Sequence, residues 1–419
     1  MRYAAGLLAT AVLSVLGSQS PLGQTMADPS EAGAAQATLQ FQECLRAIEA
    51  QAETRGISKA IYEHLRVLSP RHEVLNAVQS QAEFETPIWE YIDASVTDTR
   101  ITNGQGKLAE WRPLLDAVEA RFGVDRHILV AIWGIESSYG TVLEDLAIVK
   151  PVVQSLATLA CSHGSRAAFW RDELLTALQL LEKGDATPER MTGSWAGAMG
   201  HTQFMPTTYQ SHAIDFDGDG ERDLWTSVPD ALASTANYLR SLGWRSGEKW
   251  GYEVELPQGF DYSLADERTE RPLSDWLSLG VRLAHNRQVT AAQETAVLVL
   301  PTGARGPAFL LAPNFRVILR YNTALSYGLS VAHLSDRLRG EPPFVRSWPR
   351  GDRILTKPER EELQTLLTQR GFDPGPVDGK VGPKTRAAIR AYQASIRILP
   401  DGYAEAGLLE RIRPVPQAP

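Results

Sequence analysis

Hydrophobic residues recur at the spacing of an α-helix through much of this chain, most clearly over residues 126–140. One apolar stripe in that stretch contains Ile128, Ala131, Ile132 and Ile135. Positions three and four apart share one face of a helix, so the pattern predicts a buried helix, and Gly140 supplies a C-terminal stop.

The same spacing predicts further helices on both sides of this one. Residues 30–37 are small and polar and are predicted to form a tether. The first predicted helix contains Phe41, Cys44, Leu45 and Ile48, and a short helix follows with Ser58 as its N-cap. Further helices are predicted over 106–122, which ends at Gly123, and over 152–181, 229–244 and 320–338. Helices therefore dominate the main body of the protein.

Strand-like segments are few and lie close together in the sequence. They cover 253–256, 295–300 and 308–311, with one helix predicted near 273–279. The pattern predicts a mainly α fold of the α+β class with a minor β portion. Prolines and charged residues over 341–355 indicate a linker, and the last segment, 356–413, has the length of a small domain of about three helices.

Composition places the protein among globular chains. Its 419 residues are 43% hydrophobic and 22% charged, with a net charge of -8, and no basic stripe is present. These values predict a packed core and exclude the usual nucleic-acid-binding protein. The main body, 28–340, and the C-terminal segment then form two domains.

The N-terminus resembles a secretory signal peptide, which we assign to 1–27. A single Arg2 precedes an apolar run over 4–16 that is too short to span a bilayer as a stable helix. No cysteine follows the run, so no lipid anchor is predicted. We expect an exported, soluble protein of a Gram-negative-type periplasm without a stable membrane anchor.

The chain has two cysteines, Cys44 and Cys161. An exported protein meets an oxidising compartment, which favours a disulfide between them. Two buried thiols are the alternative, and the sequence leaves both open.

The last turn of the predicted 126–140 helix carries a single carboxylate, Glu136. Burial beside an apolar stripe raises the pKa of a carboxyl group, and a general acid needs this protonated state near neutral pH. A salt bridge to an Arg or Lys of another helix is the alternative.

Residues 191–212 differ in character from the helices around them. Gly193, Gly197 and Gly200 interrupt any long helix, and polar residues such as Ser194 and Gln203 lie between them. Polar groups on a glycine-rich turn suit contact with a ligand.

An acidic loop follows this turn. Oxygen-bearing side chains occupy positions one, three, five and nine of a calcium-loop pattern, namely Asp215, Asp217, Asp219 and Asp223, with Gly220 at position six. Glu221, in the same loop, is included among the candidate metal ligands. Position twelve is Thr226 rather than Glu. Calcium, sodium, an empty site and a solvated acidic turn therefore remain as alternatives.

Three motifs occur together and in order: Gly-Ile-Glu-Ser-Ser-Tyr-Gly at 134–140, Gly-Ser-Trp-Ala-Gly-Ala-Met-Gly-His-Thr-Gln-Phe-Met-Pro at 193–206, and Arg-Tyr-Asn at 320–322. Together they resemble the lytic murein transglycosylase B family. The resemblance implies a lysozyme-like helical domain with a groove for a glycan strand. It also implies cleavage of the β-1,4 bond between N-acetylmuramic acid and N-acetylglucosamine, leaving a 1,6-anhydro sugar.

The resemblance assigns roles to individual residues. Glu136 matches the family's catalytic acid, which later acts as base, so that no second carboxylate is assigned. Positions matching those that contact the glycan are Ser194, Gln203, Tyr238, Tyr321, Asn322 and Tyr327. Where the family often has two adjacent arginines this chain has Ser165 and Arg166, so Arg166 alone is assigned. The family's longer acidic loop closes with a later Asp, here Asp230; the cation would be structural, and no cofactor is expected for the chemistry.

The C-terminal segment has its own resemblance. Glu-Leu-Gln-Thr-Leu-Leu at 362–367, a Gly-Phe-Asp-Pro-Gly-Pro-Val-Asp-Gly turn at 371–379 and Ala-Ile-Arg-Ala-Tyr-Gln at 388–393 resemble a peptidoglycan-binding domain of the three-helix type. Such a domain would hold the enzyme on its insoluble polymer. A muramidase that uses water, and a non-catalytic wall-binding protein, are the alternative functions.

Overall fold

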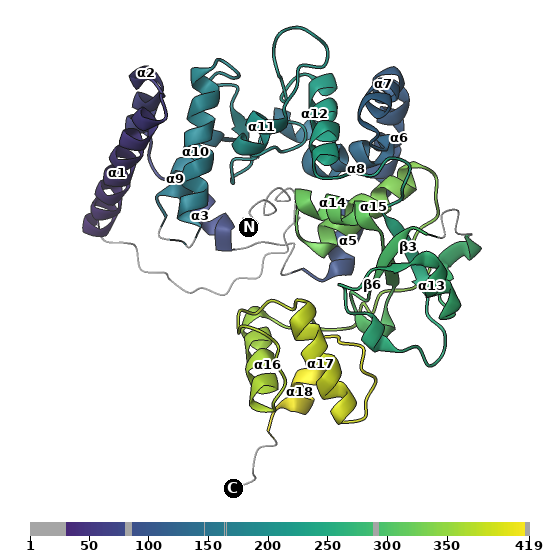
Figure 1. Ribbon diagram of the computed structural model, residues 1–419. Helices are drawn as coiled ribbons and strands as arrows, with labels where there is room; N and C mark the ends of the chain where they lie inside the picture. Colours follow the sequence, from purple (N-terminus) through teal and green to yellow (C-terminus); the bar gives the residue numbers. More distant parts are fainter. Residues whose placement is uncertain are drawn as a thin grey trace.

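The computed structural model describes residues 31–79, 86–145, 147–162, 164, 166–287 and 293–414. The predicted signal peptide and Ser165 lie outside these residues. Within them the fold is mainly helical with a small sheet, as the hydrophobic pattern predicts (Figure 1). No described helix has both the length and the apolar character needed to cross a membrane.

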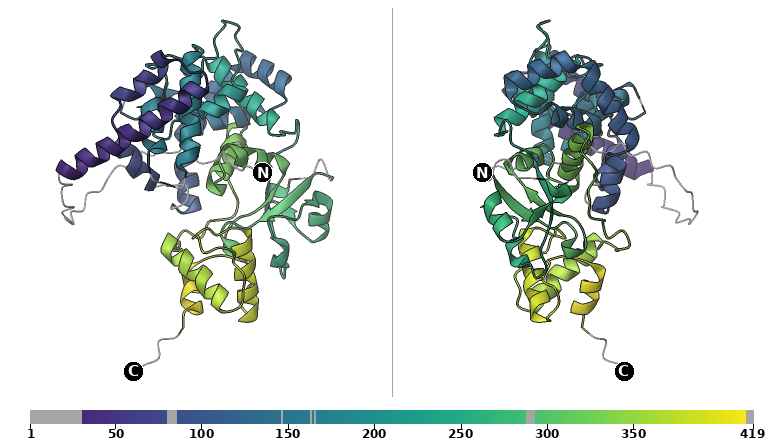
Figure 2. Two further views of the ribbon diagram at one scale, coloured as in Figure 1. Left: turned by 60° about the vertical axis from the view of Figure 1, so that its left-hand side comes forward. Right: turned by 90° about the vertical axis from the view of Figure 1, so that its right-hand side faces the viewer.

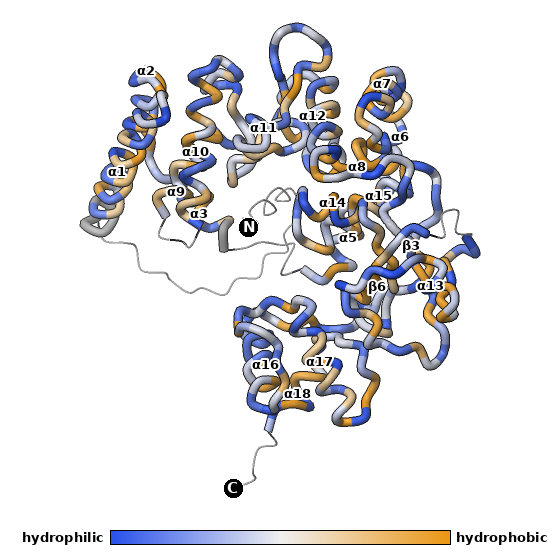
Figure 3. The backbone as a smooth tube through the Cα atoms, viewed as in Figure 1, coloured by the Kyte–Doolittle hydropathy of each residue, from blue (hydrophilic) through white to orange (hydrophobic). Residues whose placement is uncertain are grey.

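Helices before the sheet build the larger part of the molecule. They are α1 (Glu31–Thr54), α2 (Lys59–Tyr62), α3 (His72–Gln79), α5 (Ile88–Ser95), α6 (Asp98–Glu110), α7 (Arg112–Phe122), α8 (Arg126–Ser137), α9 (Val152–Ala160), α10 (Ala167–Glu182), α11 (Pro206–His212) and α12 (Val228–Ser241). Hydrophobic and hydrophilic residues interleave along α10 and α12 (Figure 3), as expected of helices with one buried face.

Two helices after the sheet return to this helical part. These are α14 (Pro313–Tyr321) and α15 (Leu325–Leu338), and α15 packs along both α8 and α5. Every residue of α8 from Ile128 to Ser137 is buried, because α15 and α12 cover it as well as α6 and α7. The predicted apolar stripe is therefore part of a helix that is buried along most of its length.

The sheet has five antiparallel strands in the described residues. In spatial order they are β4 (Arg271–Pro272), β6 (Thr295–Val299), β7 (Ala308–Leu311), β3 (Gly251–Glu255) and β5 (Arg282–Leu283), with α13 (Leu273–Ser278) following β4. A separate two-stranded ladder pairs β1 (Lys150–Pro151) with β2 (Thr192–Gly193). This ladder joins the segment after α8 to the glycine-rich turn.

Three predicted single helices are in fact pairs of helices. The 106–122 prediction is divided at Trp111, because Pro113 has no backbone N–H and favours a new helix start there. The 152–181 prediction is divided between α9 and α10, with Arg166 at the N-cap of α10. The 320–338 prediction is divided at Asn322, whose backbone is extended.

The predicted tether over 30–37 is also wrong, since α1 begins at Glu31. The same helix carries Cys44, which forms a disulfide with Cys161 at the end of α9. Of the two alternatives for the cysteines, the structure therefore has the disulfide. The disulfide connects α1, the first described helix, to the C-terminal end of α9.

The C-terminal helices have a hydrophobic core of their own. They are α16 (Lys357–Gln369), α17 (Pro383–Ser395) and α18 (Ala406–Ile412), and they enclose a core that includes Leu363, Leu367, Ile389, Leu408 and Leu409. Thr356 caps α16 in a reciprocal capping box with Glu359. In Figures 1 and 2 these helices lie below the sheet.

The segment 341–355 is a connection that packs against the main body, which a flexible linker would not do. Buried Glu253 accepts hydrogen bonds from the backbone N–H groups of Val345 (2.8 Å) and Arg346 (2.9 Å). Trp348 packs against Phe309 of the sheet core. We call this segment the packed connection.

The C-terminal helical unit also contacts the region of the sheet directly. The backbone N–H of Ala304 donates to Asp401 (3.0 Å), Arg305 pairs with Glu405, and Arg386 pairs with Glu267. These contacts add to the packed connection in fixing the unit.

Candidate active site

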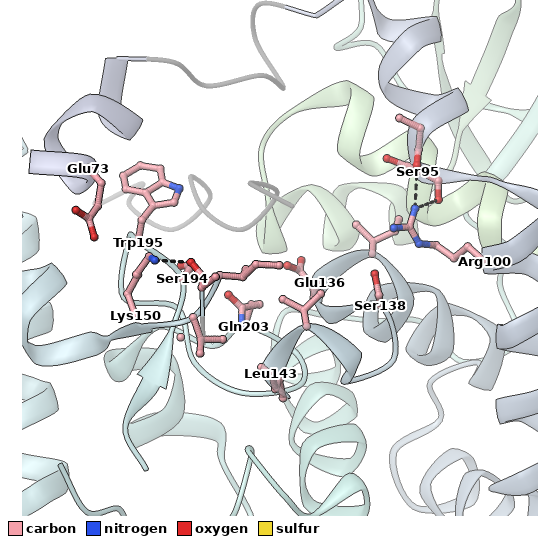
Figure 4. Close-up of a pocket in the computed structure, with 17 residues that line it drawn as sticks. Glu73, Ser95, Arg100, Glu136, Ser138, Leu143, Lys150, Ser194, Trp195 and Gln203 are labelled. Atoms are coloured by element: carbon pink, nitrogen blue, oxygen red, sulfur yellow. Dashed lines mark hydrogen bonds between the residues drawn. The ribbon is translucent and has the colours of Figure 1, made fainter. Parts of the chain in front are cut away.

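A cleft of about 300 Å³ lies beside the C-terminal end of α8. Of the residues assigned by resemblance, Glu136, Ser194 and Gln203 line it, and Figure 4 shows these three side chains close to one another near its centre. They come from α8 and from the glycine-rich turn, which lie more than 50 residues apart in the sequence. The fold therefore brings together the predicted acid and two predicted polar contacts.

Glu136 is buried at the inner wall of this cleft, with 5% of its surface exposed. Tyr327 of α15 donates its phenolic hydrogen to Glu136 Oε1 at 2.6 Å. Burial and the nearby Glu136 carboxylate raise the pKa of Tyr327 well above its ordinary value, so Tyr327 remains a neutral hydrogen-bond donor. A phenol is thus a hydrogen-bond partner of Glu136.

The end of α8 is held by contacts with the glycine-rich turn. The Ser137 hydroxyl donates to the backbone oxygen of His201 (2.7 Å) and accepts from the N–H of Gly140 (3.0 Å). Ser138, Tyr139 and Gly140 all have positive φ, so the chain turns sharply directly after Ser137. The backbone next to Glu136 is consequently fixed relative to residues 193–204.

His201 supplies a second contact between α8 and the turn. Trp133 donates its indole hydrogen to His201 Nδ1 at 3.0 Å, and burial lowers the pKa of His201 to about 4. The imidazole is therefore neutral and can accept this bond. A Cβ on Gly140 would lie 2.3 Å from the imidazole Cε1, so only glycine fits here.

The glycine-rich turn presents Ser194 and Gln203 through its own backbone bonds. Ser194 Oγ accepts from the N–H of Ala198 (3.2 Å), and Gln203 Nε2 donates to the oxygen of Gly200 (2.9 Å). A Cβ on Gly193 would lie 1.9 Å from the backbone oxygen of Ala198, which explains the glycine at that position. Both polar side chains are thereby set in place before any ligand binds.

The predicted sugar-contacting tyrosines and Asn322 lie behind the cleft wall. Tyr327 and Asn322 are 0% exposed, and Tyr238 is also buried. Tyr321 stacks on Tyr327 and donates to the backbone oxygen of Thr202. None of the four lines the cleft: Tyr238 lies on α12, Tyr321 and Asn322 at the end of α14, and Tyr327 on α15. Their visible contacts support Glu136 and the turn.

Arg166 does not line the cleft either. Its guanidinium lies over the rings of Phe169 (4.7 Å) and Trp170 (4.6 Å), and burial lowers its pKa. Arg166 is the N-cap residue of α10 and stands at the helix break that the sequence pattern did not predict. The structure gives it cation–π contacts within its own helix.

Several cleft residues were not predicted from the sequence. They are Glu73, Ser95, Arg100, Ser138, Lys150 and Trp195. Trp195 directly follows Ser194 in the glycine-rich motif, so its position in the sequence could have predicted its place in the cleft. Ser138 lies two residues after Glu136 in the 134–140 motif, which likewise indicated it. The remaining residues come from segments that approach Glu136 only in the folded chain, and nothing in their local sequence marks them.

Four carboxylates of the acidic loop gather into one cluster. Asp215, Asp217, Asp219 and Asp230 each place an oxygen within 4.8 Å of the others. Asp230 is 0% exposed, and burial raises its pKa. An all-oxygen set with one buried member suits a hard cation such as calcium.

Two of the predicted metal residues lie outside this cluster. Asp223 pairs with Arg190 and accepts from the N–H of Trp225 (2.8 Å), and Glu221 also pairs with Arg190 (3.2 Å). Both side chains are drawn away by that arginine. The structure therefore gathers the three aspartates of the loop and Asp230, and the assignment of Glu221 and Asp223 as ligands stays a prediction.

Comparison with known families gives two matches along the chain. Residues 40–336 match the transglycosylase SLT domain, and residues 356–412 match a peptidoglycan binding domain. The first match covers most of the chain and includes the cleft.

Similar proteins come from two bacteria. Membrane-bound lytic murein transglycosylase B of Escherichia coli K12 is 32% identical over 244 residues, which are 57% of this chain and 64% of that protein, slightly under two thirds of its length. SltB3 of Pseudomonas aeruginosa, solved in complex with NAG-anhNAM-pentapeptide, is 45% identical with a TM-score of 0.84, covering 89% of this chain and 99% of that one.

A calcium complex is also among the similar structures. A lytic transglycosylase of Escherichia coli solved in complex with calcium is 26% identical with a TM-score of 0.60, covering 75% of this chain and 98% of that one. The family matches, the order of the motifs and the placement of Glu136 agree with one another. This chain belongs to the transglycosylase SLT domain family of lytic murein transglycosylases.

Proposed function

We propose that this protein is a periplasmic lytic transglycosylase of peptidoglycan in which Glu136 acts first as acid and then as base. The observation that carries the proposal is the position of Glu136, buried at the centre of the cleft and hydrogen-bonded to Tyr327 at 2.6 Å. Apolar burial favours the neutral form of a carboxyl group, which is the form that donates a proton.

The proposed reaction balances without water. Glu136 gives its proton to the oxygen that joins N-acetylglucosamine to C1 of N-acetylmuramic acid, and the C1–O bond breaks. The 6-hydroxyl of the muramic sugar then bonds to C1 and returns its proton to Glu136. The N-acetyl carbonyl of the same sugar stabilises C1 between these steps, with Ser194 near enough to the acid to orient it.

A hydrolytic mechanism normally needs a second carboxylate beside the bond that breaks. Among the described residues that line the cleft, the other carboxylate is Glu73, which pairs with Arg71 at 2.7 Å. Figure 4 places Glu73 beyond Trp195, at the far end of the cleft from Glu136. This arrangement favours intramolecular ring closure over attack by water.

The test is product analysis by mass spectrometry of digested sacculi. We expect 1,6-anhydromuramic ends from the wild type, and a loss of cleavage of about a thousandfold in Glu136→Gln. Glu73→Gln, the same chemical change at the cleft end, should retain activity. Reducing ends without anhydro sugars would contradict the proposed chemistry, and full activity of Glu136→Gln would contradict the assignment of the acid.

The C-terminal unit, residues 356–413, is proposed to bind peptidoglycan and keep the catalytic part, residues 28–340, on its polymer. Because a bound module raises the local concentration of substrate, its removal should reduce cleavage of sacculi more than cleavage of soluble fragments. Glu136→Gln should still sediment with sacculi.

We also propose that Asp215, Asp217, Asp219 and Asp230 hold a structural calcium ion. The cluster of oxygen atoms within 4.8 Å supports this, and a similar structure was solved with calcium. The ion would fix the loop between α11 and α12 and take no part in the bond cleavage.

A further inference from the structure

The cleft is lined by a lysine, Lys150. Lys150 is the residue of β1 that pairs with Gly193 of β2, directly before Ser194 in the sequence. This pairing fixes Lys150 on the same wall as Ser194 and Trp195 (Figure 4). Its backbone position is therefore as well determined as that of the glycine-rich turn.

Peptidoglycan carries carboxylates on the lactyl arm of the muramic sugar or on its stem peptide. Three cationic side chains are candidates for binding these carboxylates. Arg166 is engaged by Phe169 and Trp170 and does not line the cleft. Arg100 lines it, but its Nη1 donates to the backbone oxygens of Ala94 (3.0 Å) and Ser95 (2.6 Å).

Lys150 differs from both arginines. Its ammonium donates to the backbone oxygen of Ala147 at 2.5 Å and is partly exposed. In the part of the chain that the structure describes, no carboxylate lies within ion-pair distance of it; Glu73 of the same cleft end pairs with Arg71. An ammonium has three hydrogens, so two remain for a ligand.

We propose that Lys150 binds a carboxylate of the muramoyl unit and so makes the enzyme prefer strands that carry it. The proposal rests on the proposed function, because it takes peptidoglycan as the substrate. Trp195, beside Lys150 in the cleft, offers an apolar face to the adjoining sugar or peptide. The pair forms a subsite at the end of the cleft opposite Ser95 and Arg100.

Binding measurements in a Glu136→Gln parent test this without cleavage. The probes are NAG–NAM tetrasaccharides with pentapeptides, the same compounds with every carboxyl group converted to a methylamide, and peptide-free tetrasaccharides with a free lactyl carboxylate. We expect Lys150→Met to weaken binding of a free-carboxylate probe about tenfold and to leave binding of the methylamide probe unchanged. Lys150→Arg should retain most of the affinity.

Controls separate this effect from folding and net charge. Lys183→Met removes one exposed charge outside the cleft and should change no affinity. Thermal unfolding should be alike in all variants. A loss confined to the pentapeptide probe assigns the stem, and a loss on the peptide-free probe assigns the lactyl group; both support the proposal.

Two results would overturn it. Lys150→Met could bind every probe as its parent does, or it could lose the same affinity for the methylamide probe as for the free acid. Failure of the Glu136→Gln parent to bind any probe would instead contradict the proposed function itself.

Discussion

The molecule has two kinds of buried carboxylate, and their surroundings differ. Glu136 lines the cleft and accepts a hydrogen bond from the phenol of Tyr327 at 2.6 Å. Asp230 accepts three backbone N–H bonds, from Phe216 (2.7 Å), Asp217 (3.4 Å) and Asp223 (2.9 Å), and has three other carboxylates close by. The surroundings of Glu136 suit reversible protonation. The cluster around Asp230 concentrates negative charge, which suits a cation site.

This difference reflects the number of hydrogen-bond donors that each type of carboxylate requires. A general acid needs few donors, because many donors would stabilise its ionised form. A cation ligand needs fixed oxygens, which the backbone bonds to Asp230 and the loop provide. Substitutions that change the donors of each carboxylate should therefore separate catalysis from stability.

The largest effect is expected at Tyr327. Tyr327→Phe removes the donor to Glu136 and should lower kcat by about 10- to 100-fold, the usual worth of a hydrogen bond to a charged group. Steady-state kinetics on soluble fragments would measure this.

A matched control is Tyr252→Phe, because the Tyr252 hydroxyl also donates to a glutamate, Glu294 (3.3 Å), but in the sheet. It should leave kcat unchanged. Equal kcat values for wild type and Tyr327→Phe would show that the phenol does not assist the acid.

The acidic loop should respond in stability and not in chemistry. Calcium at about 100 times its Kd should stabilise the wild type by about 2.7 kcal/mol. The corresponding rise in Tm should disappear in Asp230→Asn, as measured by calorimetry with and without a chelator. Glu221→Gln changes a carboxylate outside the cluster, so this variant should keep the rise in Tm. The same rise in Asp230→Asn would refute the proposed set of four aspartate ligands.

A third buried carboxyl group, Glu173 of α10, should give the smallest effect. It accepts from the N–H (3.0 Å) and hydroxyl (2.7 Å) of Thr207, and burial raises its pKa from 4.5 to about 7. The folded protein then binds more protons than the unfolded chain between these values, so Glu173 costs stability as pH rises through this window.

Glu173→Gln removes that dependence while keeping the shape of the side chain. The free energy of unfolding of the variant relative to wild type should therefore increase by about 2 kcal/mol between pH 5 and pH 7. Urea unfolding at several pH values measures it. A difference that does not change with pH would mean that Glu173 titrates normally.

Sequence patterns predicted most of the helices, the three main strands and the buried position of Glu136, but they did not predict α3, α5 or α11. They failed where one apolar pattern continued across two helices, at Trp111, before Arg166 and at Asn322. Helical spacing persists when two consecutive helices bury faces in the same core, so periodicity alone does not mark such breaks.

The candidate site was predicted in part for a similar reason. Glu136, Ser194 and Gln203 lie in motifs, whereas Lys150 and Arg100 reach the cleft only through tertiary packing. The placement of Tyr327 behind Glu136 depends on how α15 packs on α8, and that contact joins residues 191 positions apart. No local pattern contains this information.

The packed connection has a consequence for how far the enzyme can reach. Glu253 holds Val345 and Arg346, and Arg305 and Arg386 hold the C-terminal unit, so this unit is fixed against the main body that forms the cleft. A freely tethered module would let the cleft sample a wide sphere around its attachment point. If both regions bind glycan as proposed, each attachment presents the cleft to one short stretch of glycan, and the binding position of the C-terminal unit selects the bond that is cleaved.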